Sequence, residues 1–253
     1  MSEELLLQVN DLNKSFQGVK AVQKVSFDLH KGEILGFIGP NGSGKTTLIN
    51  CITNFVKKDS GTVIFKGGNI TKLPPHKIAD KGLVRTFQIM RPYYNLPAFK
   101  NLIIPLYSPR VKRRNLGKLG DRDKVAVDLL EDTGFERDSR IPYQLASALP
   151  TGYLKRIELA RCLALMPEVL ITDEVFSGLS VSEVTSMVPL IESLQMRGVT
   201  LIMVEHRIRE LFTLANRVIV MNFGEKIAEG KPDEVLQREE VRKAYLGSEE
   251  VST

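Results

Sequence analysis

Residues Gly39-Pro40-Asn41-Gly42-Ser43-Gly44-Lys45-Thr46-Thr47 match the glycine-rich pattern G-x-x-x-x-G-K-[ST]. The apolar run 34–38 before them is typical of a strand, and residues 47–52 continue as a helix. Glycines let backbone N–H groups turn inward at a helix N-terminus, which makes a nest for phosphate oxygens. Lys45 adds a cation for the β- and γ-phosphates, and Thr46 adds a hydroxyl for Mg²⁺. The stretch therefore predicts a P-loop that binds a nucleotide through residues 39–47.

The segments on either side of this loop predict an α/β core. The first 87 residues look strand-rich, residues 88–165 look mostly helical, and residues 166–253 alternate between the two. The runs 169–172 and 199–204 are short and apolar, as in buried parallel strands. Helical patterns follow at 181–196 and 208–215, and a last helix is expected to begin at Pro232. Strands and helices that alternate in this way indicate a parallel sheet, with the helical middle inserted into it.

Composition narrows the class of protein. The chain has 253 residues, a formal net charge of +5 and no apolar run near 18 residues, so we expect no membrane-spanning helix. Its first ten residues are acidic and are not typical of a secretory signal. Two cysteines, Cys51 and Cys162, are too few for a disulfide framework or a zinc cluster and fit a reducing cytoplasm. The positive charge permits nucleic acid, anionic lipid or phosphate partners without choosing among them.

Polar residues end three strand-like runs downstream of the loop. Asp173 and Glu174 follow the run 169–172, where an Asp can lie beside the Mg²⁺ held by Thr46 and a Glu can polarise the attacking water. His206 ends the next run, at the sheet edge where open α/β sheets bind ligands, which favours a γ-phosphate contact over an ordinary structural role. Gln88 follows the run 84–87, but a single Gln carries almost no information by itself.

These features together resemble the ATP-binding cassette (ABC) family of ATPases over nearly the whole chain. The branched-chain amino acid importer subunits within that family look most similar, on the segments Gly82–Gln88, Val204–His206, Lys226–Gly230 and Val241–Gly247. The resemblance implies a single cassette, residues 1–253. It would have a RecA-like P-loop core, an N-terminal antiparallel β subdomain and an inserted helical subdomain at about residues 88–165.

The resemblance also implies roles for single residues. Phe16 would stack on adenine, although the alternative of an ordinary core Phe is open. Asp173 would hold Mg²⁺ through water, and Gln88 would sense Mg²⁺ and link the site to a membrane partner. Glu174 would be the catalytic base, and His206 would contact the γ-phosphate.

The chain departs from the family pattern where a signature such as LSGGQ is usual. The corresponding residues are Leu149-Pro150-Thr151-Gly152-Tyr153, so Pro150 replaces a serine hydroxyl that reaches the nucleotide of the opposite subunit. Gly152, at the start of a helix, is the remaining feature of that contact. Val175 stands where proline is usual, and Ser180 stands where Asp or Asn is usual. We expect the chain to bind ATP competently and to complete its partner's site poorly; the alternative is that backbone N–H groups near Gly152 suffice.

The expected function is ATP hydrolysis with Mg²⁺ that powers transport, as a peripheral subunit on the cytoplasmic face of the membrane. Its partners would be transmembrane permease subunits and a second ATP-binding subunit, identical or not, and the transported substrate is not encoded here. Two alternatives are a mainly regulatory subunit of a heterodimer and a soluble ABC ATPase without a transport role. The basic segment Arg110–Lys118 is expected to be a solvated loop, or else to contact headgroups or permease loops. It has no interleaved aromatic residues, so we expect no nucleic-acid partner.

Overall fold

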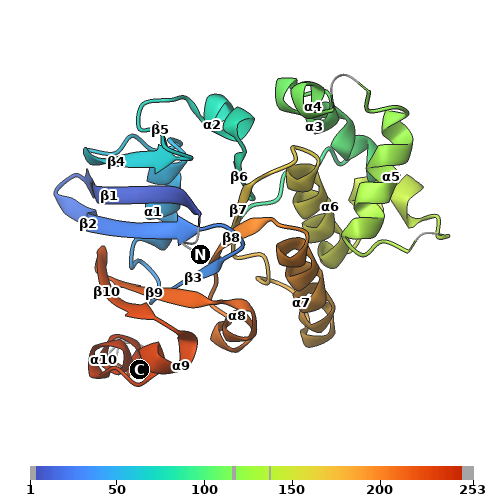
Figure 1. Cartoon of the computed structure of the whole chain (residues 1–253). Coiled ribbons are helices and arrows are strands. Elements are labelled where there is room, and N and C mark those ends of the chain that lie inside the picture. Colours follow the sequence, from blue (N-terminus) through green and yellow to red (C-terminus); the bar gives the residue numbers. More distant parts are fainter. Residues whose placement is uncertain (1–3, 116–117, 137, 247–253) are drawn as a thin grey trace.

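A computed structural model describes residues 4–115, 118–136 and 138–246 (Figure 1). Ten strands are assigned within these residues: β1 Leu5–Phe16, β2 Val19–His30, β3 Ile34–Ile38, β4 Ser60–Phe65, β5 Gly68–Asn69, β6 Leu83–Arg85, β7 Val169–Asp173, β8 Thr200–Val204, β9 Arg217–Asn222 and β10 Glu225–Gly230. The α-helices of the same residues are α1 Lys45–Ile52, α2 Pro75–Lys81, α3 Ile103–Leu106, α4 Pro109–Arg114, α5 Arg122–Asp132, α6 Thr151–Leu163, α7 Val181–Met196, α8 Ile208–Leu214, α9 Pro232–Leu236 and α10 Glu239–Leu246. Short 3₁₀ helices span Phe99–Leu102, Ile141–Tyr143 and Ala146–Ala148.

The strands form two sheets. The smaller is antiparallel, with the order β2-β1-β4-β5, and the larger has the order β10-β9-β3-β8-β7-β6. The five strands β9, β3, β8, β7 and β6 of the larger sheet run parallel, and β10 pairs antiparallel with β9 at its edge. The expected α/β architecture with an N-terminal antiparallel β subdomain is therefore confirmed.

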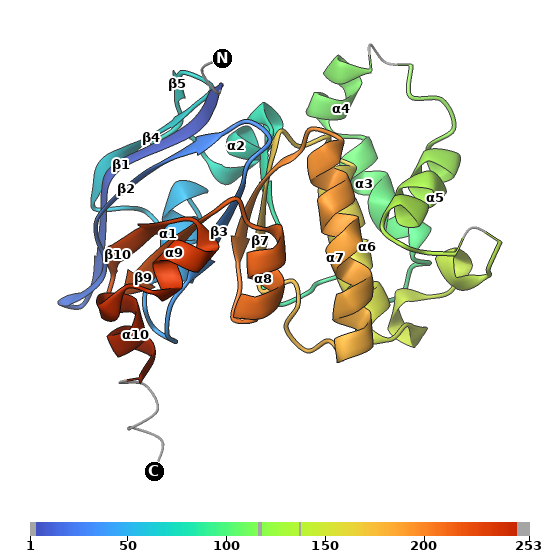
Figure 2. The same ribbon diagram turned by 60° about the horizontal axis from the view of Figure 1, so that its bottom comes forward.

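The larger sheet is covered on both faces, which explains why its strands read as continuous apolar runs. Leu35 and Phe37 of β3 pack toward α1 and the antiparallel sheet, whereas Ile34 and Ile38 pack on the other face, toward α7 and α8. Figure 2 shows α1 between the antiparallel sheet and β3. This packing places the carboxyl ends of β3, β7 and β8 at one edge of the sheet.

Helices α3, α5 and α6 and the 3₁₀ helix Phe99–Leu102 build a third core of their own, which is the core of the inserted helical subdomain. Ile157 and Ala160 of α6, with Ala164 at its C-cap, face this core, while Leu159 and Cys162 face the core of the larger sheet. Figures 1 and 2 both show α6 between the parallel sheet and α5. Helix α6 therefore belongs to both packing units and connects them.

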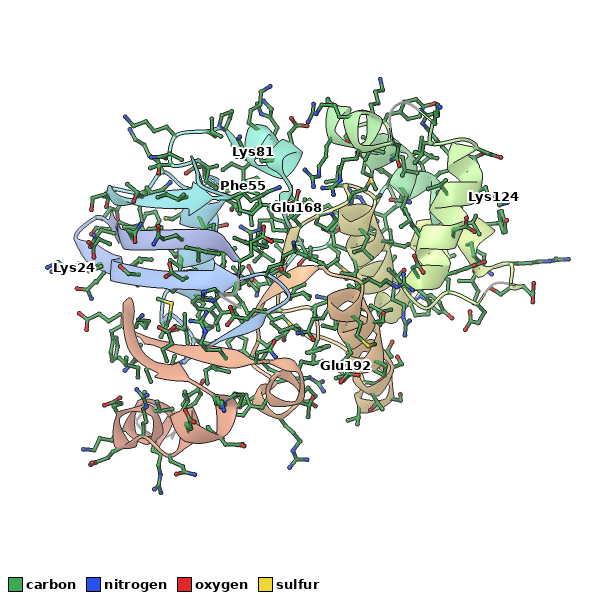
Figure 3. The ribbon with its side chains drawn as sticks, in the orientation of Figure 1. Lys24, Phe55, Lys81, Lys124, Glu168 and Glu192 are labelled. Atoms are coloured by element: carbon green, nitrogen blue, oxygen red, sulfur yellow. The ribbon has the colours of Figure 1, made fainter. Side chains whose placement is uncertain are left out.

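The expectation of a loop at Arg110–Lys118 is wrong for residues 110–114, which belong to α4, and the expectation of solvation is wrong for Arg110, whereas Lys112, Arg113, Arg114 and Lys118 are exposed. The Arg110 side chain is only 5% exposed and donates to the backbone oxygens of Leu165 and Met166. Arg110 and Arg114 also pair with Glu168, at 3.1 and 2.9 Å. Glu168 lies near the centre of the molecule (Figure 3), so these charges join parts of the fold. Residues 116–117 lie outside the described residues.

The expected last helix at Pro232 is followed by a second one. Helix α9 begins at Pro232 as predicted but ends at Leu236, and α10 begins at Glu239. The expectation of a single last helix is therefore wrong. The segment Val241–Gly247, quoted above for the family resemblance, lies in α10 except for Gly247, which is outside the described residues.

Candidate active site

The P-loop joins the end of β3 to the start of α1, and two of its glycines are required by space and by backbone conformation. Gly39 has φ +148° and Gly44 has φ +100°, in the region that L side chains rarely adopt. A Cβ at Gly39 would lie 2.1 Å from the Met221 carbonyl oxygen, and one at Gly44 would lie 2.2 Å from that of Ala21. The loop therefore packs so closely on its neighbours that only glycine fits at these positions.

Lys45 is held beneath this loop. Its side chain is 6% exposed, and Nζ donates to the Gly39 oxygen at 2.7 Å, the Pro40 oxygen at 3.0 Å and Ser43 Oγ at 3.2 Å. Burial lowers the pKa of Lys45, and the carboxylates of Glu174 and Asp173 oppose this effect. The amine is therefore a buried cation whose present partners are neutral oxygens that an anionic ligand can replace.

Asp173 ends β7 as a 1% exposed carboxylate with one paired and one unpaired oxygen. Oδ2 pairs with Arg85 Nη2 at 3.2 Å. Burial raises the pKa of Asp173, while Arg85 and the nearby Thr46 hydroxyl lower it. Among the described residues, none donates to Oδ1 with normal hydrogen-bond geometry.

The unpaired Oδ1 and the Thr46 hydroxyl fit a hard cation such as Mg²⁺, which takes oxygen ligands. The described residues contain no group of three His, Cys, Asp or Glu side chains able to hold a metal ion. The two oxygens therefore fit Mg²⁺ as a partial ligand set, which phosphate and water oxygens would complete.

Glu174 follows Asp173 with its carboxylate between two polar side chains from other elements. Oε1 lies 2.9 Å from His206 Nε2, and Oε2 accepts from Gln88 Nε2 at 2.9 Å. Gln88 comes after β6 and His206 after β8, the two strands that flank β7 in the sheet. The sheet order thus brings together three residues that lie far apart in the sequence.

Most of the predicted phosphate-binding and catalytic residues surround one cavity of about 190 Å³. Its lining is Ala21, Asn41, Gly42, Ser43, Gly44, Lys45, Thr46, Thr47, Gln88, Glu174 and His206. Gly39, Pro40 and Asp173 are not in this lining, and Asp173 lines an adjoining groove. Phe16 is outside this lining, at the end of β1; it is 45% exposed, so the alternative of a core Phe is wrong. Its adenine contact stays a prediction.

Gly152 also lies away from the cavity, in the first turn of α6. The Glu183 side chain of α7 lies against Gly152, where a Cβ would be 2.4 Å from Oε1. The Ser180 hydroxyl and N–H, and to a smaller extent the Gly152 N–H, lower the pKa of that carboxylate. Tyr153, in the same turn, is directed into the helical subdomain, where its hydroxyl lies 3.0 and 3.1 Å from the Glu136 carboxylate oxygens and its ring packs on Phe135. Pro150 precedes α6 and supplies no side-chain cap.

Ser180, another departure from the family pattern, has a clear local role. Its Oγ accepts from the Glu183 N–H, and the Glu183 carboxylate accepts from the Ser180 N–H, which is a capping box at the start of α7.

Three buried charged residues next to the site were not singled out from the sequence. Arg85 pairs with Asp173 and lies 4.6 Å from the ring centre of Phe87. Lys155 donates to the Glu174 backbone oxygen, and Glu205 accepts from the Phe176 N–H. Arg85 and Glu205 had a weak signal, a charge at the end of an apolar run, whereas Lys155 had none.

Comparisons with known proteins agree on one family. The model of the family "ABC transporter" matches residues 22–177, and that of the family "Branched-chain amino acid ATP-binding cassette transporter" matches residues 225–251. The probable branched-chain amino acid transport ATP-binding protein LivG of Archaeoglobus fulgidus is 35% identical, over 97% of this chain and 96% of its own length. LivG of Escherichia coli is 34% identical, over 96% and 98%.

Solved structures agree with these relatives. A nucleotide-free ATP-binding cassette from an ABC transporter superposes with a TM-score of 0.83 at 30% identity, over 95% of this chain and 98% of that one. The ADP conformation of a cassette from an ABC transporter gives 0.83 at 31% identity, over 96% and 99%.

Proposed function

The chain belongs to the ABC transporter family of ATP-binding subunits, and from this premise we propose that it hydrolyses ATP at the Gly39–Thr47 loop to power transport by separate membrane subunits. The observation that carries the proposal is the Glu174 carboxylate, held between Gln88 and His206 at the cavity that the P-loop lines. An acceptor fixed at the edge of a phosphate site is what general-base attack by water requires.

The residues divide the reaction among them. The N–H groups of the loop bind the phosphates, and Lys45 exchanges its carbonyl partners for phosphate oxygens. Thr46 and Asp173 hold Mg²⁺, which when bound neutralises charge on the phosphates. Glu174 accepts the proton of the attacking water, and His206 contacts the γ-phosphate. Gln88 senses whether nucleotide and Mg²⁺ are bound, through its hydrogen bond to Glu174.

A Glu174→Gln variant tests this division. The amide keeps the size and the contacts of the side chain but cannot accept the proton, so we expect ATP affinity within about twofold of wild type and turnover reduced by at least about 100-fold. The exposed Glu192 on α7 (Figure 3) offers a matched control, and Glu192→Gln should hydrolyse ATP normally. Undiminished hydrolysis by Glu174→Gln would reject Glu174 as the base.

The transported substrate is proposed to be a branched-chain or other amino acid, moved inward. The support is the similarity to the LivG proteins over nearly the full length and the match of residues 225–251 to the branched-chain family. Uptake of labelled leucine into vesicles that contain the co-purified membrane subunits tests this directly. Uptake driven only by another solute class would contradict it.

The partners are proposed to dock next to Gln88. A groove of about 590 Å³ adjoins that residue, and the exposed side chains of Phe55, Phe87 and Ile89 line it. Charged side chains, among them Arg91, Glu158 and Arg161, line the rest of the groove. Exposed apolar side chains within such a groove fit a cytoplasmic helix of a permease subunit, which supports a peripheral position of the chain on the cytoplasmic membrane face. No helix within the described residues is both long and apolar enough to cross a bilayer.

A second proposal concerns the altered signature, which favours a subunit that completes its partner's nucleotide site poorly. Pro150 offers no hydroxyl, Tyr153 is directed away into the helical subdomain, and the Gly152 N–H faces Glu183. In a heterodimer, the nucleotide site formed by this P-loop and the partner's signature would hydrolyse ATP, and the site completed by this chain's signature would hydrolyse it slowly. A single-turnover assay in the native assembly distinguishes slow hydrolysis from a subunit that only binds nucleotide and regulates.

Restoring the usual cap tests the second proposal. The combined change Pro150→Ser, Thr151→Gly and Tyr153→Gln should raise ATP turnover of the purified assembly by about tenfold, because a donor to a charged group contributes about 1.5–3 kcal/mol. An unchanged rate would mean that the present signature is already sufficient.

A further inference from the structure

The turn after β7 holds Glu174 in a conformation that is uncommon for a residue with a side chain. Its φ is +55°, in the left-handed region. Its N–H donates to the Val204 oxygen at 2.8 Å, which continues the pairing of β7 with β8. This conformation aims the carboxylate at Gln88 and His206. An unfavourable backbone angle persists only where surrounding contacts stabilise it. The side chains that contact this turn are therefore the candidates for holding the Glu174 carboxylate in position.

Lys155 contacts the turn from α6. Its Nζ donates to the Glu174 backbone oxygen at 3.0 Å, and the residue is 6% exposed. Burial lowers the pKa of Lys155, and the surrounding carboxylates, Glu205 first among them, oppose this. A buried amine is costly to desolvate, and this one directs its hydrogen bond at the carbonyl of the residue whose conformation is strained.

Glu205 contacts the turn from β8. The residue is 2% exposed, and its Oε1 accepts from the Phe176 N–H at 3.3 Å. The Val175 N–H is also close enough to this carboxyl group to favour its ionised form. Two successive N–H groups after Glu174 therefore face one side chain. A proline at position 175 has no N–H and could not take part.

We propose that Lys155, from α6, and Glu205, from the end of β8, are positioning residues that hold the Glu174 turn and keep its carboxylate between Gln88 and His206. The inference rests on the proposed role of Glu174 as the base. Lys155 lies one helical turn after Gly152, so the contact also ties the start of α6, in the helical subdomain, to the catalytic residue of the same chain.

The test compares Lys155→Met, Lys155→Arg and a matched control, Lys58→Met, in the full chain assembled with its native partners. Lys58 is also a buried lysine, 8% exposed, whose Nζ donates to a backbone oxygen, that of Thr71 at 2.9 Å, but it lies outside the site. We expect Lys155→Met to lower kcat by about tenfold or more and to leave ATP affinity within about twofold, since misplaced reacting groups cost rates of this order. Lys155→Arg should restore most of kcat, and Lys58→Met should leave kcat unchanged.

Hydrogen exchange of the full chain gives a readout that does not depend on activity. The Val175 and Phe176 amides should exchange faster in Lys155→Met and in Glu205→Ala than in wild type or Lys58→Met, because their contacts with residue 205 open more often or are lost. If Lys155→Met does not fold, Glu205→Ala carries the same two measurements.

Wild-type kcat in Lys155→Met, an equal loss in Lys58→Met, or unchanged exchange at both amides would overturn the proposal. The Glu174→Gln variant separates the two proposals. If Glu174→Gln hydrolyses ATP normally, the proposed function itself fails. If it is inactive while Lys155→Met is fully active, only the positioning role fails.

Discussion

At the scale of single residues, the site combines groups that were visible in the sequence with groups that were not. Lys45, Thr46 and the two carboxylates of residues 173–174 follow from short contiguous patterns. The roles of Arg85 and Lys155 follow from the structure. Arg85 pairs with Asp173, 88 positions away in the chain, and Lys155 donates to the backbone oxygen of Glu174, 19 positions away. A buried charge requires a partner, but its identity depends on what the fold places opposite it.

Glu205 gives a residue-scale prediction on pH. Burial raises its pKa from 4.5 to about 8, which Glu174 reinforces and Lys155 and the N–H groups of the turn oppose. As the pH rises through this window, the carboxyl group ionises in the unfolded chain before it does so in the folded one. The unfolded state then binds fewer protons, so this group makes the free energy of unfolding fall with increasing pH.

The variant Glu205→Gln removes that effect. Its stability relative to wild type should therefore increase from pH 5 to pH 8, by up to a few kcal/mol on the basis of about 1.4 kcal/mol per pKa unit. Urea denaturation at pH 5, 6.5 and 8 measures the difference, and other titrating groups cancel in the comparison. A stability difference that does not change with pH would show that Glu205 titrates normally.

At the scale of elements, the strands and helices predicted at 34–38, 47–52, 169–172, 181–196, 199–204 and 208–215 lie within two residues of the observed bounds. Helix α7 and strand β3 were predicted at their observed bounds, because apolar periodicity and flanking glycines mark both ends. Helix α4 was missed, since its basic residues read as solvated. Its N-cap, Ser108, and Pro109 at its first position are local signals that could have been used.

The capping box of α7 gives an element-scale prediction. Ser180→Ala removes the acceptor of the Glu183 N–H, so the free energy of unfolding should fall by about 1 kcal/mol. Thr185→Ala is the control, because that exposed hydroxyl only bonds back to the Val181 oxygen of its own helix, and a change within about 0.5 kcal/mol is expected. Equal effects of the two variants in urea denaturation would argue against the cap.

At the scale of the whole molecule, charged side chains connect the helical subdomain to the sheets. Arg110 of α4 reaches the Asp80 oxygen in the last turn of α2 and the oxygens of Leu165 and Met166 before β7, and it pairs with Glu168. Figure 3 shows Glu168 where these parts meet. The connection was read from the sequence as a solvent-exposed loop, because no local pattern reveals that a basic side chain has buried acceptors.

Removing the Arg110 contacts should lower the stability of the fold. Arg110→Met leaves several buried acceptors without a donor, so we expect the free energy of unfolding to fall by about 3 kcal/mol. Arg113→Met is the matched control, since Arg113 is more than half exposed and makes a surface ion pair with Asp80, which contributes less than about 1 kcal/mol. Similar losses in the two variants would contradict a structural role for Arg110.

The sequence alone determined the P-loop, the alternation of strands and helices, and the two carboxylates after β7, because each depends on neighbours in the chain. Local sterics require glycine at φ values near +100°, and apolar periodicity marks the faces that must be buried. The tertiary structure alone decided which side chains meet Glu174 and Asp173, where Tyr153 points, and that Arg110 is buried. These are contacts between elements, and a charged side chain acquires its role only when folding brings an acceptor within hydrogen-bonding distance.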